Sequence, residues 1–219
     1  MSERRTRRDS RRRSLGQNFL TDPSVVERLV DAASIDPGEL VVDLGAGRGA
    51  LTLALARAGA RVRAIEIDPV WERRLRRRVT ENELADRVEV VRGDIRRTPL
   101  PDEPYRVVAS PPFGLTTAVL SRLLDEPALG PWRADILIQW EVTAKRAAQP
   151  PTSLRSAAWA PWWTFEMGME VARSSFRPVP SVDAAVLVAR RRPTPVLPEW
   201  LAPGFRELLR PGWDPPARR

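Results

Sequence analysis

LVVDLGAGRG, residues 40–49, is the stretch of sequence that decides the fold. The apolar run Leu40–Leu44 predicts a buried strand, and glycines follow it at positions 45, 47 and 49. Glycine permits the tight turn and the close backbone approach that a ligand-binding loop needs. Residues 51–58 then predict a helix that ends near Gly59. Together these elements predict the first unit of an α/β domain.

Strand and helix patterns continue to alternate on both sides of this stretch. Asp22-Pro23 predicts a helix start, and further helices are predicted from Pro69, over residues 116–124 and up to Lys145. Strands are predicted at residues 40–44, 62–67, 88–91, 105–109, 136–140, 165–173 and 183–189. This order predicts βαβ units and a mostly parallel sheet, with the last two strands as an antiparallel hairpin at its edge.

Composition excludes several kinds of chemistry. The 219 residues contain no cysteine and no histidine, which removes disulfides, thiol nucleophiles, histidine bases and Cys/His zinc sites. No carboxylate spacing suggests another metal site, so we expect none. No stretch approaches the roughly 18–20 apolar residues of a membrane helix, and the N-terminus lacks a secretory pattern. We therefore expect a cytoplasmic protein that does not bind membranes.

The net charge of +8 favours a polyanionic partner. Lys145 is the only lysine, so a high-GC genome can explain arginine over lysine, but it does not require a positive balance. Residues 1–13 carry seven arginines without apolar periodicity, which predicts a disordered arm. The arm is either a solubilising tail or, as we favour, a segment that contacts RNA phosphates. Residues 14–192 are predicted to form the globular domain.

Carboxylates follow three successive predicted strands. Asp43 precedes the glycines, Glu66 ends the second strand, and Asp94 follows the third. One such residue alone would be read as a cap or turn residue. Three at successive strand ends suit a ligand with an adenine, a ribose and a cation but no phosphate, because an acidic residue before the glycines would repel phosphate. S-adenosylmethionine is such a ligand.

Ser110-Pro111-Pro112-Phe113 lies just past the fourth predicted strand, at the sheet edge where open α/β folds bind ligands. Prolines fix the backbone and bring no N–H of their own. A hydroxyl and a fixed carbonyl can therefore accept both hydrogens of an exocyclic amine, and Phe113 can stack on a base that has left its helix or loop. Alone, this segment could equally be a rigid turn with a core phenylalanine. The glycine loop upstream favours catalysis.

At this point the chain resembles the ribosomal RNA adenine dimethyltransferases over roughly residues 14–190. The motifs that carry the resemblance occur in the same order: Gln17–Leu20, Asp43–Gly49, Ser110–Phe113 and Ser175–Val182. Gln139–Val142 and the tryptophan-rich residues 159–163 look closer to the Erm-type antibiotic-resistance enzymes than to the small-subunit enzymes. The resemblance implies a Rossmann-like methyltransferase with a seven-stranded sheet and an antiparallel edge strand. It also implies methylation of the N6 amine of a large-subunit (23S) rRNA adenine, which blocks macrolide, lincosamide and streptogramin B binding.

The resemblance also assigns roles to residues. Those it implies for S-adenosylmethionine are Gln17, Asn18, Leu20, Asp43, Gly45, Gly47, Glu66, Ile67, Asp94, Ile95 and Ser110. Ser110, Pro111 and Phe113 would hold the target amine and base. Phe176 would cover the other face of the flipped adenine, and Arg177 would contact the RNA backbone. Phe176 could instead be a core residue between two prolines.

Two departures from the family matter. The family usually has asparagine where Ser110 stands, and a serine is a shorter, single acceptor, so we predict weaker catalysis or mainly monomethylation. The family also has a C-terminal helical RNA-binding domain, and we expect residues 193–219 to be a truncated remnant of it. RNA binding would then shift to the arm and to surfaces such as Arg73, Arg74, Arg76, Arg77 and Arg78, unless these form an ordinary solvated helix face.

Alternative functions remain at the level of sequence. One is a small-subunit rRNA or DNA adenine methyltransferase. Another is a non-catalytic RNA-binding or assembly protein on a methyltransferase scaffold, and Ser110 with the short C-terminus supports it. A third is a small-molecule methyltransferase, which the arginine-rich arm opposes. We expect the protein to be a monomer.

Overall fold

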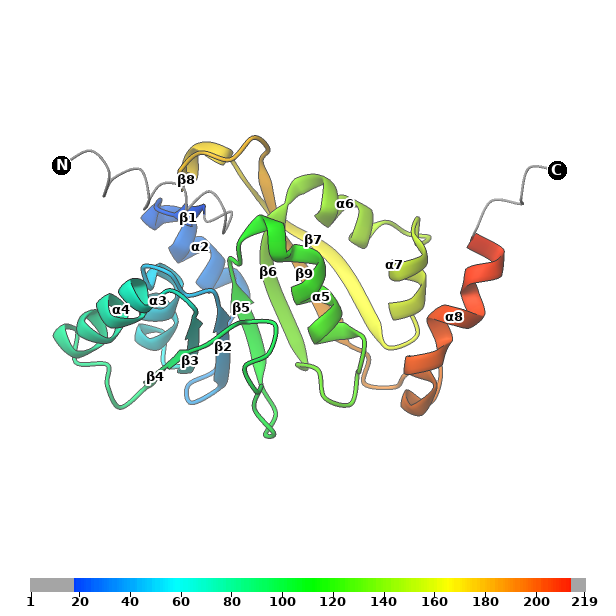
Figure 1. Ribbon diagram of the computed structural model, residues 1–219, viewed down its shortest axis with the longest axis horizontal. Coiled ribbons are helices and arrows are strands. Elements are labelled where there is room, and N and C mark those ends of the chain that lie inside the picture. Colours follow the sequence, from blue (N-terminus) through cyan, green and yellow to red (C-terminus); the bar gives the residue numbers. More distant parts are fainter. Residues whose placement is uncertain (1–17, 214–219) are drawn as a thin grey trace.

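A computed structural model describes residues 18–213, and its centre is a seven-stranded sheet (Figure 1). The strand order is β4-β3-β2-β5-β6-β9-β7. Five neighbouring strands run parallel: β4 (Val88–Arg92), β3 (Arg61–Glu66), β2 (Leu40–Leu44), β5 (Arg106–Ala109) and β6 (Arg133–Gln139). Their carboxyl ends therefore meet at one edge of the sheet, where ligands bind in folds of this kind.

The last two strands complete the sheet in antiparallel fashion. β9 (Ala184–Arg191) lies between β6 and β7 (Trp163–Val171) and pairs antiparallel with both. The predicted hairpin is thus present, with β7 outside β9 at the edge. The structure confirms the predicted Rossmann-like α/β fold with a mostly parallel seven-stranded sheet.

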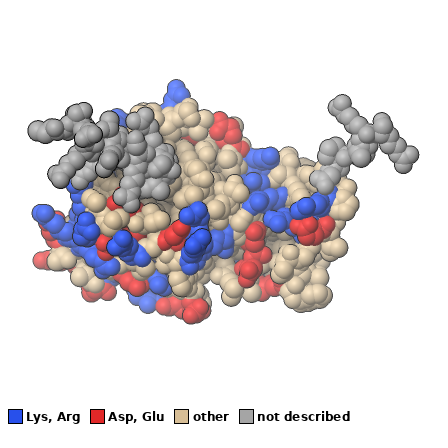
Figure 2. Space-filling view, in the orientation of Figure 1, with Lys and Arg blue, Asp and Glu red and all other residues tan. Residues whose placement is uncertain are grey.

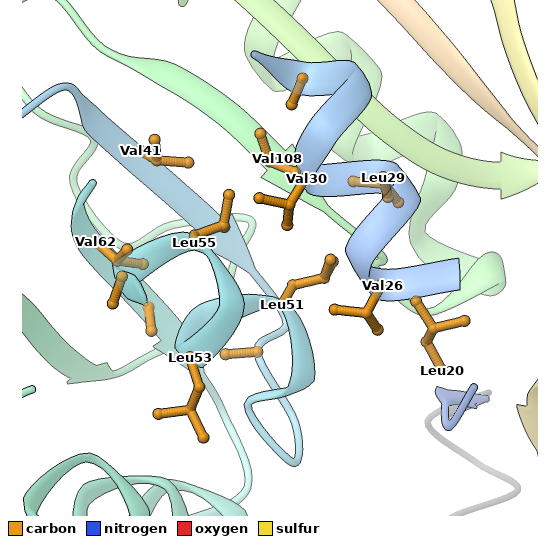
Figure 3. Close-up of a cluster of buried hydrophobic side chains, with 14 of the residues drawn as sticks. Leu20, Val26, Leu29, Val30, Val41, Leu51, Leu53, Leu55, Val62 and Val108 are labelled. Atoms are coloured by element: carbon orange, nitrogen blue, oxygen red, sulfur yellow. The ribbon is translucent and has the colours of Figure 1, made fainter. Parts of the chain in front are cut away.

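One face of the sheet is covered by α2 (Pro23–Ala33), α3 (Ala50–Arg57) and α4 (Pro69–Glu81). Asp22 and Asp68 cap α2 and α4, each accepting a hydrogen bond from the backbone N–H two residues on, with proline at the first helical position. Figure 3 shows how α2 and α3 contribute the leucines and valines that pack against β2, β3 and β5. Leu20 reaches the same cluster and ties the segment before α2 to the core.

The opposite face is covered by α5 (Thr116–Leu124) and α7 (Leu154–Trp159), while α6 (Trp140–Ala147) lies against β9 and β7. Trp159, Trp162 and Trp163 are buried there, and each indole N–H donates to an oxygen elsewhere in the chain. α8 (Ala202–Trp213), after the short helix η3 (Glu199–Leu201), lies beyond α7 at one end of the molecule (Figure 1). Phe205 meets Trp162 edge-on, with ring centroids 5.6 Å apart.

A separate two-stranded sheet joins segments that are far apart in the sequence. β1 (Phe19–Leu20) pairs antiparallel with β8 (Phe176–Arg177), which follows the short helix η2 (Arg173–Ser175). Thr21 reinforces the pairing, because both its backbone N–H and its hydroxyl donate to the carbonyl of Ser175. We call this pair the β1–β8 ribbon; it lies above the sheet edge where β2 and β5 end (Figure 1).

Within residues 18–213, no helix is long and apolar enough to cross a membrane, and no group of three or more acidic side chains is arranged to hold a metal ion. The arginine-rich arm, Gln17 and residues 214–219 lie outside the described residues. The expected boundaries of the arm and of the C-terminal remnant stay predictions.

Candidate active site

A pocket of about 470 Å³ opens at the carboxyl edge of the parallel strands. The loops after β2, β3, β4 and β5 form its walls, and β1 closes one side. Its volume falls in the range of small-molecule sites. Its lining residues are Asn18, Phe19, Leu20, Asp43, Gly45, Ala46, Arg48, Ala50, Leu51, Glu66, Ile67, Asp94, Ile95, Arg96, Ser110, Pro112, Gly114 and Leu115.

Glu66 is a carboxylate of the pocket that the backbone itself holds in place. It is buried at the end of β3, and its two oxygens accept hydrogen bonds from the backbone N–H of Gly47 at 2.7 Å and of Asp68 at 2.8 Å. Burial raises its pKa, while these two N–H groups act in the opposite direction. The carboxylate is thus held in one orientation by the glycine loop itself. Its remaining lone pairs can accept from ligand hydroxyls.

Asp43 lies deeper, at the base of the glycine loop. It is buried, and its carboxylate accepts a 2.6 Å hydrogen bond from the hydroxyl of Thr52 on α3. Burial raises the pKa of Asp43 to about 7, with a further upward contribution from the charge of Glu66. A cationic ligand in the pocket would favour its ionised form.

This shifted pKa predicts a pH dependence of stability. In the folded protein Asp43 holds its proton up to about pH 7, whereas its ordinary pKa is 3.8, so its contribution to stability is full at low pH. That contribution is lost as pH rises through the folded-state pKa. We therefore expect the stability of Asp43→Asn, relative to the parent protein, to increase from about pH 5 to about pH 7.5 in urea unfolding. A difference that stays constant with pH would contradict the prediction.

Asp94 is occupied by a neighbour in this conformation. The Arg96 guanidinium donates to both of its oxygens, with the shortest contact at 2.6 Å, and the Arg96 backbone N–H donates to Oδ1 at 2.9 Å. These bonds lower the pKa of Asp94 to about 2. Arg96 itself lines the pocket, so the wall expected to receive an adenine presents a carboxylate together with a guanidinium.

The β1–β8 ribbon brings Phe19 onto the glycine loop. A Cβ atom at Gly47, where φ is +53°, would stand 2.9 Å from the Phe19 ring, so only glycine permits this contact. The Phe19 ring in turn meets the Trp71 ring of α4, with centroids 5.1 Å apart. The Arg48 guanidinium lies 5.2 Å from the Phe19 ring centroid and 5.3 Å from the Trp71 ring centroid. This cluster fixes the side of the pocket that the β1–β8 ribbon closes.

Ser110 and Pro112 line the same pocket from the loop after β5. Pro111 is buried behind them, and Phe113 begins the short helix η1 (Phe113–Leu115). Gln139, at the end of β6, donates to the Phe113 carbonyl at 3.3 Å and accepts from the Thr116 hydroxyl at 2.8 Å. The diproline loop is thus fixed from the neighbouring strand and faces the same cavity as the carboxylates.

Phe176 and Arg177 lie beside this loop on β8. The Phe176 ring is fully buried and meets Phe113 edge-on, with centroids 5.8 Å apart. Arg177 is exposed, and its guanidinium donates to the carbonyls of Ser174 and Phe176, each at 2.7 Å. In this conformation the two phenylalanine rings contact each other, so a base that enters between them must separate them.

The arginines of α4 are largely engaged within the fold. Arg76 pairs with Glu72 and Arg77 with Glu81, while Arg78 donates to the carbonyl of Arg48 and Arg74 lies over Trp71. Figure 2 shows blue basic and red acidic side chains interspersed in this region. These contacts favour an ordinary solvated helix face over an RNA-binding patch at this position.

The structure brings most of the predicted site residues together. Asn18, Leu20, Asp43, Gly45, Glu66, Ile67, Asp94, Ile95 and Ser110 line the pocket, and Gly47 holds Glu66. Pro111, Phe113, Phe176 and Arg177 lie next to it, whereas Gln17 is outside the described residues. Sequence reasoning missed Arg48, Arg96 and the positioning role of Gln139. Only Gln139 carried a usable signal, as a polar residue that ends an apolar strand.

The residues present fit S-adenosylmethionine. Three carboxylates face one cavity, which suits a cation with ribose hydroxyls and an adenine amine. A Cβ at Gly45, where φ is +82°, would come within 3.3 Å of Pro112, so this glycine permits the close approach of the two loops that form the pocket. The roles of individual residues toward the cofactor remain predictions.

Comparison with known proteins decides the family. The profile described as Ribosomal RNA adenine dimethylase matches residues 8–211. The chain belongs to this family. The resemblance inferred from the sequence motifs is therefore confirmed, and the site belongs to a member of the ribosomal RNA adenine dimethylase family.

Individual relatives of this family member carry related names. It is 40% identical over 208 residues to the mycinamicin-resistance protein MyrB of Micromonospora griseorubida, with 94% of this chain and 64% of that protein covered. It is 39% identical over 195 residues to an rRNA adenine N-6-methyltransferase of Corynebacterium diphtheriae, covering 89% and 74%. The crystal structure of the 23S rRNA methyltransferase ErmE matches with a TM-score of 0.78 at 31% identity, covering 89% and 80%. The chain thus spans just under two thirds of the length of MyrB.

Proposed function

We propose that this protein transfers a methyl group from S-adenosylmethionine to the N6 amine of an adenine in large-subunit rRNA. The methylated ribosome would resist macrolide, lincosamide and streptogramin B antibiotics. The observation that carries the proposal is that the diproline loop and the three carboxylates face one cavity. The relatives named as rRNA methyltransferases and as a mycinamicin-resistance protein support the substrate class. Because the proposed substrate is ribosomal, we expect the protein to act in the cytoplasm, and we expect it to be a monomer.

Different residues of this chain would position different parts of the cofactor. Glu66 would hold the ribose hydroxyls, Asp94 with Ile95 the adenine, and Asn18 the methionine end of the cofactor. When bound, S-adenosylmethionine supplies a reactive methyl group on a sulfonium. The chain contains no cysteine or histidine that could act as a nucleophile. This agrees with direct methyl transfer in which the enzyme forms no covalent intermediate.

The target amine would be held by the diproline loop. The Ser110 hydroxyl and the Pro111 carbonyl would accept its two hydrogens and so orient the nitrogen lone pair. Gln139 keeps this loop in place through its hydrogen bond to the Phe113 carbonyl. Orientation of this kind can contribute several kcal/mol, and carbonyl dipoles stabilise the positive charge that develops on the nitrogen. Phe113 would stack on the base.

Incubation with large- and small-subunit rRNA and methyl-labelled S-adenosylmethionine tests the function. We expect label in adenines of large-subunit rRNA and a primer-extension stop at the modified position. Label confined to small-subunit rRNA would support the small-subunit alternative instead. Absence of S-adenosylmethionine binding by calorimetry, together with no transfer to either RNA, would support the non-catalytic scaffold.

The serine at position 110 leads to a prediction of how many methyl groups the target N6 amine receives. A serine is shorter than the family's usual asparagine and holds the amine less firmly, so we expect mainly N6-monomethyladenine. Ser110→Asn should raise the dimethylated share severalfold. Mass spectrometry of nucleosides from the modified rRNA measures both forms, and predominance of dimethyladenine with the parent protein would contradict this prediction.

A further inference from the structure

Trp140 is an exposed aromatic residue next to the diproline loop. It is the first residue of α6, directly after β6, and 37% of its surface is accessible. Its backbone N–H donates to the Asp183 carbonyl at 3.0 Å, which fixes its position against the chain that leads into β9. The ring is therefore held by a rigid backbone at the edge of the sheet where the proposed chemistry takes place.

Two hydrogen-bonded links tie this position to the proposed target site. The side chain of the preceding residue, Gln139, donates a 3.3 Å hydrogen bond to the Phe113 carbonyl. The Asp183 carboxylate accepts from the Arg173 backbone N–H at 2.9 Å, just before the segment that carries Phe176 and Arg177. Trp140 is thus connected both to the loop expected to hold the target amine and to the segment expected to contact the base.

Most of the other tryptophans near the sheet have contacts that explain their positions, whereas Trp200 and Trp213 are exposed on η3 and α8, beyond α7. Trp159, Trp162 and Trp163 are buried with bonded indoles, and Trp132 lies under the Arg106 guanidinium at 5.2 Å. Within residues 18–213, by contrast, no ring contact or cation–π contact involves Trp140. The exposed part of the Trp140 side chain therefore has no aromatic or guanidinium partner among these residues.

We propose that Trp140 stacks on an unpaired base that flanks the target adenine in the RNA. This inference rests on the proposed function. An adenine that leaves its stack deprives a neighbouring base of its stacking partner, and an exposed indole can replace that partner. Exposed Arg177 and Lys145 provide positive charge for the adjoining phosphates. Trp140 is in this view a substrate-binding residue outside the cofactor pocket.

Binding of a fluorescein-labelled hairpin of large-subunit rRNA with an unpaired adenine tests the inference by anisotropy. Stacking on an aromatic side chain contributes about tenfold or more to affinity. We expect Trp140→Ala to raise the RNA Kd about tenfold, and Trp140→Phe to recover most of the loss because it keeps a stacking face. Trp200→Ala, which removes a more exposed tryptophan on η3, should leave the RNA Kd unchanged.

Calorimetry with S-adenosylmethionine separates stacking from a structural role. We expect the cofactor Kd of Trp140→Ala to equal that of the parent protein. An unchanged RNA Kd, or an RNA Kd that Phe fails to restore, would overturn the inference, as would an equal loss with Trp200→Ala. The binding assay needs no methyl transfer. Absence of transfer to an RNA that the parent protein binds would reject the proposed function, while the Trp140 series would still decide the stacking.

Discussion

Replacement of Glu66 by alanine is expected to raise the Kd for S-adenosylmethionine by about a hundredfold or more. The Glu66 carboxylate is buried and oriented by backbone N–H groups of Gly47 and Asp68. A hydrogen bond to a charged group contributes about 1.5–3 kcal/mol, and two ribose hydroxyls can each donate one. Two bonds at the lower limit already amount to about 3 kcal/mol, which corresponds to roughly a hundredfold in affinity. The variant also leaves two loop N–H groups without their acceptor.

Calorimetric titration of the purified variants measures this effect. Glu66→Gln retains the side-chain shape but replaces one acceptor oxygen with a donor, so we expect an intermediate loss. Glu89→Ala is the matched control, because Glu89 is a carboxylate of the adjacent strand β4 that is mostly exposed and pairs with Arg63 at 3.4 Å. A Glu66→Ala protein that binds the cofactor within about threefold of the parent would remove this residue from the site.

The pocket could be predicted from sequence because parallel strands align their ends. Asp43, Glu66 and Ser110 each follow or end an apolar run, and the βαβ order places all such ends on one edge of the sheet. The local pattern was sufficient, since no long-range contact had to be known. The same reasoning explains why the fold itself was predicted correctly.

The side of the pocket that the β1–β8 ribbon closes could not be predicted in this way. β1 and β8 contain two residues each, too few for a periodic pattern, and their pairing joins Phe19 to Arg177 across most of the chain. The pairing of Arg96 with Asp94 is similarly invisible, because alternation of charge in a loop does not reveal which side chains meet. Such contacts depend on tertiary structure, and the sequence motif for this region indicated only a family resemblance.

The second large effect concerns stability at the opposite edge of the sheet. Asp135→Ala is expected to lower the free energy of unfolding by about 3–5 kcal/mol, because it leaves the buried Arg106 without its main counter-ion. Arg106 is 1% exposed, and its guanidinium lies 3.0 Å from Asp135 and 3.6 Å from Glu39. It also donates to the carbonyls of Ala33 and Ser34. These neutral acceptors and the more distant Glu39 compensate only in part for a lost carboxylate.

Thermal unfolding distinguishes this buried network from surface ion pairs. For a protein of this size the loss corresponds to a fall in Tm of about 6–20 °C. Glu103→Ala is the control, since it breaks a 2.8 Å pair with Arg61 in which both side chains are about half exposed, and such pairs contribute about 0–1 kcal/mol. Arg106 begins β5, whereas Ser110 follows its other end, so Asp135→Ala should leave the cofactor Kd of the folded protein unchanged. A Tm shift no larger than that of Glu103→Ala would mean that water or Glu39 replaces Asp135 without loss.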